Sequence, residues 1–383
     1  MSTIYLDHQA TTPTDPAVVE AMTFAATQCY ANPSSPHAAG IRAFREVERA
    51  RGAVARFIGA GRGEICFTSG ATEGNNLAIK GVVGAGAARH VVTTAVEHKS
   101  VLDSCRALRD AGHEVTVLPV DGEGRVDPDR VAAALRPETA LVSVMLANNE
   151  IGTVQPVARI AELTRAAGVP LHCDATQGVG SLPVDVRTLG ADLLTFSGHK
   201  IYGPKGVGVL YVSHRLSDRA PLVPQLHGGG QERGLRAGTL NTAAVIGLGT
   251  AVGVLAACRE AEAVRLAGLR ELFLAELSGL VPYVLNSGVG PGFLPHAVNL
   301  SFPGVDAQQL LLEVADVAVS TGSACNSAAQ EPSHVLLAIG LPPERVRSSV
   351  RVSFGRFTTE ADAVRAARAL ATAATPGGSP TTA

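Results

Sequence analysis

The chain has 383 residues, which is enough for one large domain with a smaller one or for two domains of ordinary size. Hydrophobic residues make up 46% of it and charged residues only 17%, so the chain can bury a sizeable core. The formal net charge is −2 and no long run of like charge occurs, which argues against binding to nucleic acid or to an acidic membrane surface.

The N-terminus and the cysteines indicate the expected compartment. No basic segment followed by an apolar stretch opens the sequence, so no signal peptide is expected. The longest apolar stretch, near 245–257, is interrupted by glycine and is too short to span a bilayer. The six cysteines are scattered without a C-x-x-C pair, which supports neither a zinc site nor a disulfide framework. We therefore expect a cytoplasmic protein without a metal site.

Short apolar runs alternate with helical patterns over the first two thirds of the chain. Strands are expected at 64–68, 90–94, 114–119, 140–145, 170–174, 193–197 and 206–212. Helices are expected between them at 74–81, 100–111, 128–135 and 156–167. Such alternation predicts a mostly parallel sheet covered by helices, with its ligand at the carboxyl ends of the strands.

A long helical pattern at 242–277 is expected to join this sheet to a smaller C-terminal α+β domain. In that domain we expect strands at 297–302, 318–320 and 349–353 and helices at 306–315, 332–339 and 359–373. The predicted organisation is a large domain at 13–258, a small domain made of 1–12 and 259–374, and a disordered tail at 375–383.

One lysine stands out, because only four of the 32 basic residues are lysines. Lys200 ends a Ser-Gly-His-Lys sequence directly after a predicted strand, where it could form a Schiff base while Ser197 and His199 reach a phosphate. The alternative is a strand-end loop with a solvated lysine. Lys205 lies in a rigid Gly-Pro-Lys-Gly turn, and we interpret it as structural or as a surface charge.

Two further polar stretches also follow predicted strands. Asp174 comes 26 residues before Lys200, where a carboxylate could keep a pyridinium nitrogen protonated and make pyridoxal phosphate an electron sink. Taken alone, an N-cap aspartate is the more common role. Thr72 lies among small residues between a strand and a helix, where backbone N–H groups and a hydroxyl suit a phosphate. An ordinary capped turn is an equal alternative there.

A histidine and a cysteine complete the candidate chemistry. His98 ends another strand and could stack on a flat ring and relay protons, although a lone histidine there is more often structural. Cys325 lies in the small-residue run 320–329 as a candidate nucleophile, with gap filling as the alternative, whereas Cys66 suits an inert core. The glycine-rich stretch 81–86 follows a helix rather than a strand, so it fails as a dinucleotide fingerprint.

Taken in order, these motifs resemble those of the cysteine desulfurases of the NifS/IscS-like group, within the class V aminotransferases of pyridoxal 5′-phosphate (PLP) fold type I. The resemblance extends from Tyr5 to about Thr359. The motifs that carry it are Asp7-His8-Gln9-Ala10-Thr11-Thr12, Asn32-Pro33-Ser34-Ser35, Ser69-Gly70-Ala71-Thr72-Glu73, Asn148-Asn149-Glu150-Ile151-Gly152, Asp174-Ala175-Thr176-Gln177, Ser197-Gly198-His199-Lys200, His227-Gly228-Gly229-Gly230-Gln231, Arg236-Ala237-Gly238-Thr239, Gly322-Ser323-Ala324-Cys325 and Arg351-Val352-Ser353-Phe354-Gly355-Arg356.

The resemblance implies an α/β fold, the PLP-dependent transferase fold type I, with a large domain around a mostly parallel sheet and a smaller C-terminal α+β domain. It implies that Lys200 is the cofactor lysine and that Asp174 is the partner of the pyridine nitrogen. Gln177 would bond the phenolate oxygen, His98 would stack on the ring, and Asn149 would lie beside the ring near the substrate.

The resemblance also assigns the phosphate and the substrate. The phosphate-binding residues would be Thr72, Ser197 and His199, with Thr239 contributed by the other subunit of a homodimer. Asn32, Asn149 and Arg351 would bind the substrate, L-cysteine. A bidentate guanidinium at Arg351 suits the substrate carboxylate.

The implied reaction converts L-cysteine to L-alanine and leaves the sulfur as a persulfide on Cys325. A protein acceptor would use that sulfur for iron–sulfur cluster assembly or for thiolation of tRNA, DNA (as phosphorothioate) or a metabolite. If the loop must close, Cys325 is expected to lie well away from the cofactor at rest. Asn326 and Ala237 depart from the usual Thr and Ser without stopping catalysis. The chain ends sooner than relatives of the IscS type, which leaves the acceptor open.

Three other functions compete with this one. A sister PLP activity (selenocysteine lyase, cystine lyase or a true aminotransferase) is the main rival, and Cys325 argues against a plain aminotransferase. A non-catalytic sulfur carrier would not need the set of Lys200, Asp174, His98 and Cys325. A nicotinamide-dependent dehydrogenase lacks its fingerprint.

Overall fold

The computed structural model describes residues 3–84, 89–217, 222–322 and 332–375. Its largest sheet has seven strands in the order β2-β8-β7-β6-β5-β3-β4. The strands are β2 (Ile65–Thr68), β3 (His90–Thr94), β4 (Glu114–Leu118), β5 (Thr139–Ser143), β6 (Leu171–Asp174), β7 (Leu193–Ser197) and β8 (Gly208–Val212). Neighbouring strands are parallel except at β8, which is antiparallel to β2 and β7. The predicted mostly parallel sheet is confirmed.

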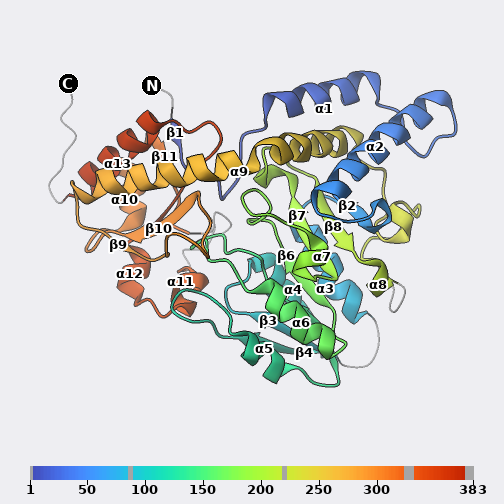
Figure 1. Ribbon diagram of the computed structural model, residues 1–383, viewed down its shortest axis with the longest axis horizontal. Helices are drawn as coiled ribbons and strands as arrows, with labels where there is room; N and C mark the ends of the chain where they lie inside the picture. The colour runs from blue at the N-terminus through green and yellow to red at the C-terminus, as the bar shows by residue number, and fades with distance from the viewer. Residues whose placement is uncertain (1–2, 85–88, 218–221, 323–331, 376–383) are drawn as a thin grey trace.

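Helices cover this sheet, and six of its strands are buried along their whole length, as expected for a sheet packed on both faces (Figure 1). The helices are α1 (Pro16–Gln28), α2 (Ala38–Phe57), α3 (Ala71–Val83), α4 (Lys99–Asp110), α5 (Pro128–Ala134), α6 (Val157–Ala166), α7 (Val186–Leu189) and α8 (His214–Ser217). Helices α1 and α2 were not predicted from the sequence. A signal for α1 was present, because Asp15 caps the helix and Pro16 takes its first position.

Helix α9 (Thr242–Ser278) crosses the molecule along its length (Figure 1). It packs on α1 and α2 at one end and on α13 (Glu360–Ala374) at the other. By length and composition α9 could cross a membrane, with a mean hydropathy of 1.6. Its buried side chains instead enter both hydrophobic cores, Leu248 in one and Phe273 in the other.

The C-terminal part forms the smaller α+β unit that the sequence predicts. Its strands are β9 (Val284–Leu285), β10 (Ala297–Ser301) and β12 (Ser349–Ser353) in the order β12-β10-β9, with a separate parallel pair of β1 (Ile4–Tyr5) and β11 (Val317–Ala318). Its other helices are α10 (Ala307–Glu313), α11 (His334–Ala338) and α12 (Pro343–Arg347). The short elements β9 and α12 were not predicted. The residues 376–383 of the expected disordered tail lie outside the described part.

Two main cores correspond to the two units. The larger core surrounds the seven-stranded sheet and draws its residues from 18–255. The smaller one joins Ile4 and Leu6 to side chains from 266–374, so the N-terminal strand belongs to the C-terminal unit. The exact domain limits at 13–258, and at 1–12 with 259–374, stay a prediction.

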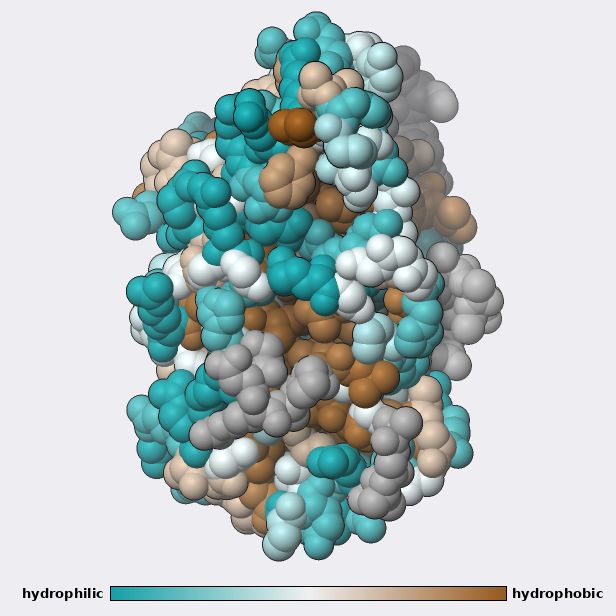
Figure 2. Space-filling model, turned by 90° about the vertical axis from the view of Figure 1, so that its right-hand side faces the viewer, coloured by the Kyte–Doolittle hydropathy of each residue, from teal (hydrophilic) through white to brown (hydrophobic). Residues whose placement is uncertain are grey.

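Apolar side chains are exposed on one side of the molecule. Figure 2 looks onto the side that carries α2 and α8, and apolar side chains gather in the middle of that face. The segment between α8 and α9 adds the exposed apolar side chains of Val223 and Leu226. A face of this kind is typical of a protein–protein contact.

Candidate active site

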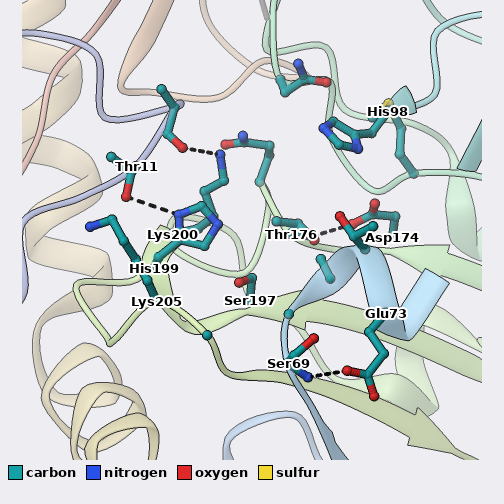
Figure 3. A pocket seen from close by; sticks show the side chains of 18 of the residues that line it. Thr11, Ser69, Glu73, His98, Asp174, Thr176, Ser197, His199, Lys200 and Lys205 are labelled. Atoms are coloured by element: carbon teal, nitrogen blue, oxygen red, sulfur yellow. Dashed lines mark hydrogen bonds between the residues drawn. The ribbon is translucent and has the colours of Figure 1, made fainter. Parts of the chain in front are cut away.

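A cavity of about 420 Å³ opens at the carboxyl ends of the sheet strands, where ligands of such sheets bind. Its wall brings together eight of the predicted site residues: Thr72, His98, Asn149, Asp174, Gln177, Ser197, His199 and Lys200. In Figure 3, Lys200 and His199 lie on one side of the cavity, and Asp174 and His98 on the other. Arg351, Asn32 and Thr239 do not line it, and Cys325 lies outside the described residues.

The first turn of α3 forms one end of the cavity. Gly70 caps this helix without a side-chain hydrogen bond, so the first backbone N–H groups of α3 are left to bind an anion. The hydroxyl-bearing Thr72 and Ser197 stand at the same end. Gly208 of β8 lets the loop sit this close, because a Cβ there would lie 2.6 Å from the backbone of Gly70. This end can bind a phosphate with neutral donors.

Lys200 lies on the short 3₁₀ turn that follows β7, and it contacts the N-terminal segment. Its Nζ donates to the carbonyl oxygen of Ala10 at 2.8 Å and also to that of Gln9. The Gln177 amide donates to the same Gln9 carbonyl at 2.9 Å. Burial, and then the positive charge of Lys200, lowers the pKa of His199 to about 4. His199 is therefore a neutral ring at pH 7.

Asp174 ends β6 with its carboxylate held by two donors. Its Oδ2 accepts from the Asn75 amide at 2.7 Å, and its Oδ1 accepts from the backbone N–H of Thr176 at 3.0 Å. The fully buried Asn75 also donates to the Ser100 hydroxyl at 2.9 Å. Asn75 was not among the predicted site residues. Its spacing of three residues from Thr72 on α3 was the available signal, because residues three apart share a helix face.

His98 caps α4 with its own ring. The Nδ1 atom accepts from the backbone N–H of Ser100 at 3.1 Å and lies 2.8 Å from the hydroxyl of the same residue. Burial lowers the pKa of His98, and the charge of Lys200 adds to that effect while Asp174 opposes it. His98 is thus a neutral ring in the cavity wall.

Glu97, the residue before His98, is a buried carboxyl group that was not predicted as part of the site. Its Oε1 accepts from the Thr94 hydroxyl at 2.8 Å and from the backbone N–H of Met145 at 2.9 Å. Its Oε2 is buried and finds no hydrogen-bond partner in the described part of the chain. Burial raises the pKa of Glu97 to about 8, so the group is mostly protonated at neutral pH. It joins the ends of β3 and β5 beneath the cavity.

Arg351 lies on β12 with only 1% of its surface exposed. Its guanidinium pairs with Asp7 at 2.7 Å and donates to the carbonyl oxygen of Asn149 at 2.9 Å. Since Asn149 lines the cavity, Arg351 stands directly behind the wall. Its Nε is buried without a hydrogen-bond partner in the described residues.

Thr239 and Asn32 are both exposed on this chain. Asn32 lies on the connection between α1 and α2. Thr239 lies three residues after Arg236, which bonds the cavity residue Glu73 at 2.8 Å. The segment that carries Thr239 is therefore bonded to the end of the cavity at the start of α3, which can bind a phosphate. Thr239 itself does not line the cavity.

The donor set fits a flat molecule with an anionic group at one end and a basic ring nitrogen at the other. The hydroxyl groups and the N-terminus of α3 at one end suit an anion, and the carboxylate of Asp174 suits a protonated ring nitrogen. The Thr176 hydroxyl in the wall is buried without a hydrogen-bond partner among the described residues, as expected where a ligand supplies one. Within the described part of the chain, no group of three or more His, Cys, Asp or Glu side chains could hold a metal ion.

Comparison with known proteins gives one consistent result. Residues 4–365 match the family model described as aminotransferase class-V. The cysteine desulfurase IscS of Anaeromyxobacter dehalogenans is 49% identical over 360 residues, which cover 93% of this chain and 89% of that protein. A solved NifS-like protein superposes with a TM-score of 0.90 at 32% identity, covering 96% of this chain and 98% of its own. SspA in complex with cysteine superposes with a TM-score of 0.82 at 36% identity, covering 93% and 99%.

Proposed function

Because this chain belongs to the aminotransferase class-V family, we propose that it is a cysteine desulfurase that converts L-cysteine to L-alanine and passes on the sulfur. The observation that carries the proposal is the meeting of Lys200, Asp174 and His98 in one cavity. The likeness to SspA in complex with cysteine supports the choice of substrate.

The cofactor of the proposal is PLP, whose ring supplies an electron sink for negative charge at the substrate carbon when it is bound. Lys200 would attach it, Asp174 would hold its ring nitrogen, and Gln177 would bond the ring oxygen. His98 and Asn149 would flank the ring. The phosphate would lie at the start of α3 against Thr72, Ser197 and His199.

Each step of the proposed reaction is assigned to a residue of the chain. Arg351 binds the carboxylate of L-cysteine, helped by Asn149 and Asn32. Lys200 moves a proton at its Nζ atom, because this amine would also attach the cofactor. The cavity wall has a second lysine, Lys205, in the turn before β8, to which no proton transfer is assigned. The thiolate of Cys325 attacks the substrate sulfur, so that an S–S bond forms as the C–S bond breaks. The electron pair of the broken bond stays with the carbon skeleton, which takes up a proton and leaves as L-alanine.

A second copy of the chain completes the site in this proposal. Thr239 is exposed here and would reach the phosphate of the partner's cofactor. The uncovered apolar face seen in Figure 2 supplies a surface on which two copies can meet. The persulfide on Cys325 would pass to a protein acceptor in the cytoplasm, for iron–sulfur cluster assembly or for thiolation of tRNA, DNA or a metabolite.

The test is release of alanine and sulfide from L-cysteine in the presence of a reductant. Unchanged protein should give both products, and Cys325→Ala should give almost no sulfide while it keeps the yellow cofactor absorbance. Cys258→Ala is the matched control, because Cys258 is a partly exposed thiol on α9 outside the cavity. Full activity of Cys325→Ala would favour a lyase that forms no persulfide.

A further inference from the structure

The way α4 begins restricts the protonation of His98. His98 is the N-cap of this helix, with φ −62° and ψ 148°, and its Nδ1 accepts the backbone N–H of Ser100. A backbone N–H can only donate, so Nδ1 must present its lone pair. A proton on Nδ1 would point at that N–H and remove the cap.

A second donor meets the same nitrogen. The Ser100 hydroxyl lies 2.8 Å from Nδ1 of His98 and also accepts from the Asn75 amide at 2.9 Å. The amide nitrogen of Asn75 can only donate, so the hydroxyl accepts from it through its oxygen and turns its own proton toward Nδ1. The other N–H of the same amide donates to Asp174 at 2.7 Å, and the acceptor-only carboxylate fixes which way the amide faces.

We propose that these contacts hold His98 as the neutral ring with its proton on Nε2, and that Asn75 is the positioning residue that sets this state. The proposal rests on the proposed function and gives His98 one role in it. A ring that already carries its proton on Nε2 donates a hydrogen bond from that atom and takes up no proton there. Lys200 is then the group that accepts the substrate proton.

The charges around His98 agree with this state without creating it. Asp174 at the end of β6 favours a proton on the ring, as does Asp103 of α4. Lys200 after β7 and His334 of α11 oppose it, and burial is the largest effect and also favours the neutral ring. The geometry at Nδ1 then selects which neutral form is present.

The experiment is nitrogen NMR of the holoenzyme with labelled histidine, with the His98 signals assigned by their loss in His98→Gln. We expect an acceptor-type Nδ1 and an N–H-type Nε2 that stay unchanged as the pH falls from 8 to 6. His37 is an internal comparison, because it caps α2 through Nδ1 in the same way but is exposed and lacks the hydroxyl contact. An N–H-type Nδ1 on His98, or a doubly protonated ring at pH 7, would overturn the proposal.

Two variants test the part played by Asn75. Asn75→Ala frees the Ser100 hydroxyl to accept, so the His98 ring should take up a proton at a higher pH or show part of the Nδ1–H form. Ser100→Ala should act in the same direction and keeps the experiment decisive if Asn75→Ala does not fold. Asn76→Ala, at a half-buried position of α3 whose side chain donates to the Thr72 carbonyl, is the matched control and should leave the His98 signals unchanged. Unchanged signals in both test variants would show that Asn75 does not set the state of His98.

These readouts separate the two proposals. The ring state of His98 is measured with or without turnover of L-cysteine. A protein that releases no sulfide but shows the expected Nε2–H ring would refute the desulfurase assignment alone. A protein that releases sulfide with an Nδ1–H ring would refute the inference alone.

Discussion

The two walls of the cavity are held in different ways. On the wall where β6 ends beside α3 and α4, Asp174, Asn75, Ser100 and His98 are joined by hydrogen bonds that need no ligand. On the wall toward the C-terminal unit, Arg351 is bonded to Asp7 and to a backbone carbonyl. The first wall is preorganised for a cofactor. In the second wall, Arg351 must leave Asp7 before it can bind a substrate carboxylate.

The largest effect is expected at Lys200, the group that both walls of the cavity face. Lys200→Ala should lower alanine formation by roughly 10³-fold or more, since it removes both the attachment amine and the proton carrier. The measurement is alanine release at saturating L-cysteine. Lys80→Ala, on α3 outside the cavity, is the control and should keep its rate. A Lys200→Ala protein with normal turnover would refute the assigned role of this lysine.

The preorganised wall is tested next at Asp174. Asp174→Asn keeps the size of the side chain but replaces a carboxylate with a neutral amide, so a protonated ring nitrogen is no longer stabilised. Alanine formation should fall on the order of 10²-fold, the usual loss when one preorganised electrostatic partner is removed. Asp129→Asn on the exposed side of α5 is the control. An unaffected rate would mean that Asp174 serves only to orient Asn75.

The sequence predicted the preorganised wall better than the other one. Lys200 and Asp174 were found because each directly follows an apolar strand, and parallel strands bring their carboxyl ends to one edge. Asn75 and Glu97 were missed because their partners are Asp174 and Met145, which lie far away in sequence and become neighbours only when the strands align. Local patterns predict strands and strand ends, but not which side chains meet between them.

The same limit applies to the other wall. The family motif places Arg351 near the substrate, and nothing in the local sequence indicates that Asp7 binds it from 344 residues away. Helices α1 and α2 were missed for another reason. The prediction rests on strands that alternate with helices, and these two helices precede the first strand of the large sheet.

Glu97 links the first wall to the pH dependence of the protein's stability. Its pKa is raised to about 8 in the folded protein, above the ordinary glutamate value of 4.5, because burial disfavours the ionised form. Below about pH 4 the Glu97 carboxyl is neutral in both the folded and the unfolded chain, so it costs no stability. As the pH rises toward 8, the unfolded chain ionises this group while the folded protein keeps it neutral, so the free energy of unfolding falls. Glu97→Gln does not titrate and should lack this loss.

The measurement is urea unfolding of both proteins at pH 5 and pH 8. The stability of the Gln variant relative to the unchanged protein should increase between these pH values by roughly 2 to 4 kcal/mol. Any constant cost of the buried amide cancels in this difference. Glu260→Gln on the exposed surface of α9 should show no such change. Equal pH dependence of the two proteins would place an ionised carboxylate at Glu97 and contradict the raised pKa.

The smallest effect is expected at Asp7, and it tests the second wall most directly. If Arg351 must leave Asp7 to bind the substrate carboxylate, a weaker internal pair should favour the substrate. Asp7→Asn keeps a hydrogen-bond acceptor but removes the charge, which weakens the contact by about 1 kcal/mol. The KM for L-cysteine should then fall by roughly fivefold while kcat stays nearly constant.

Asp15→Asn is the matched control for that change. Asp15 also pairs an N-terminal carboxylate with an arginine of the C-terminal part, Arg356, at 2.8 Å, and asparagine still caps α1 in its place. Thermal unfolding of both variants separates lost stability from altered binding. If Asp7→Asn raises the KM, the pair orients Arg351 for the substrate instead of competing with it. The second wall would then be as preorganised as the first.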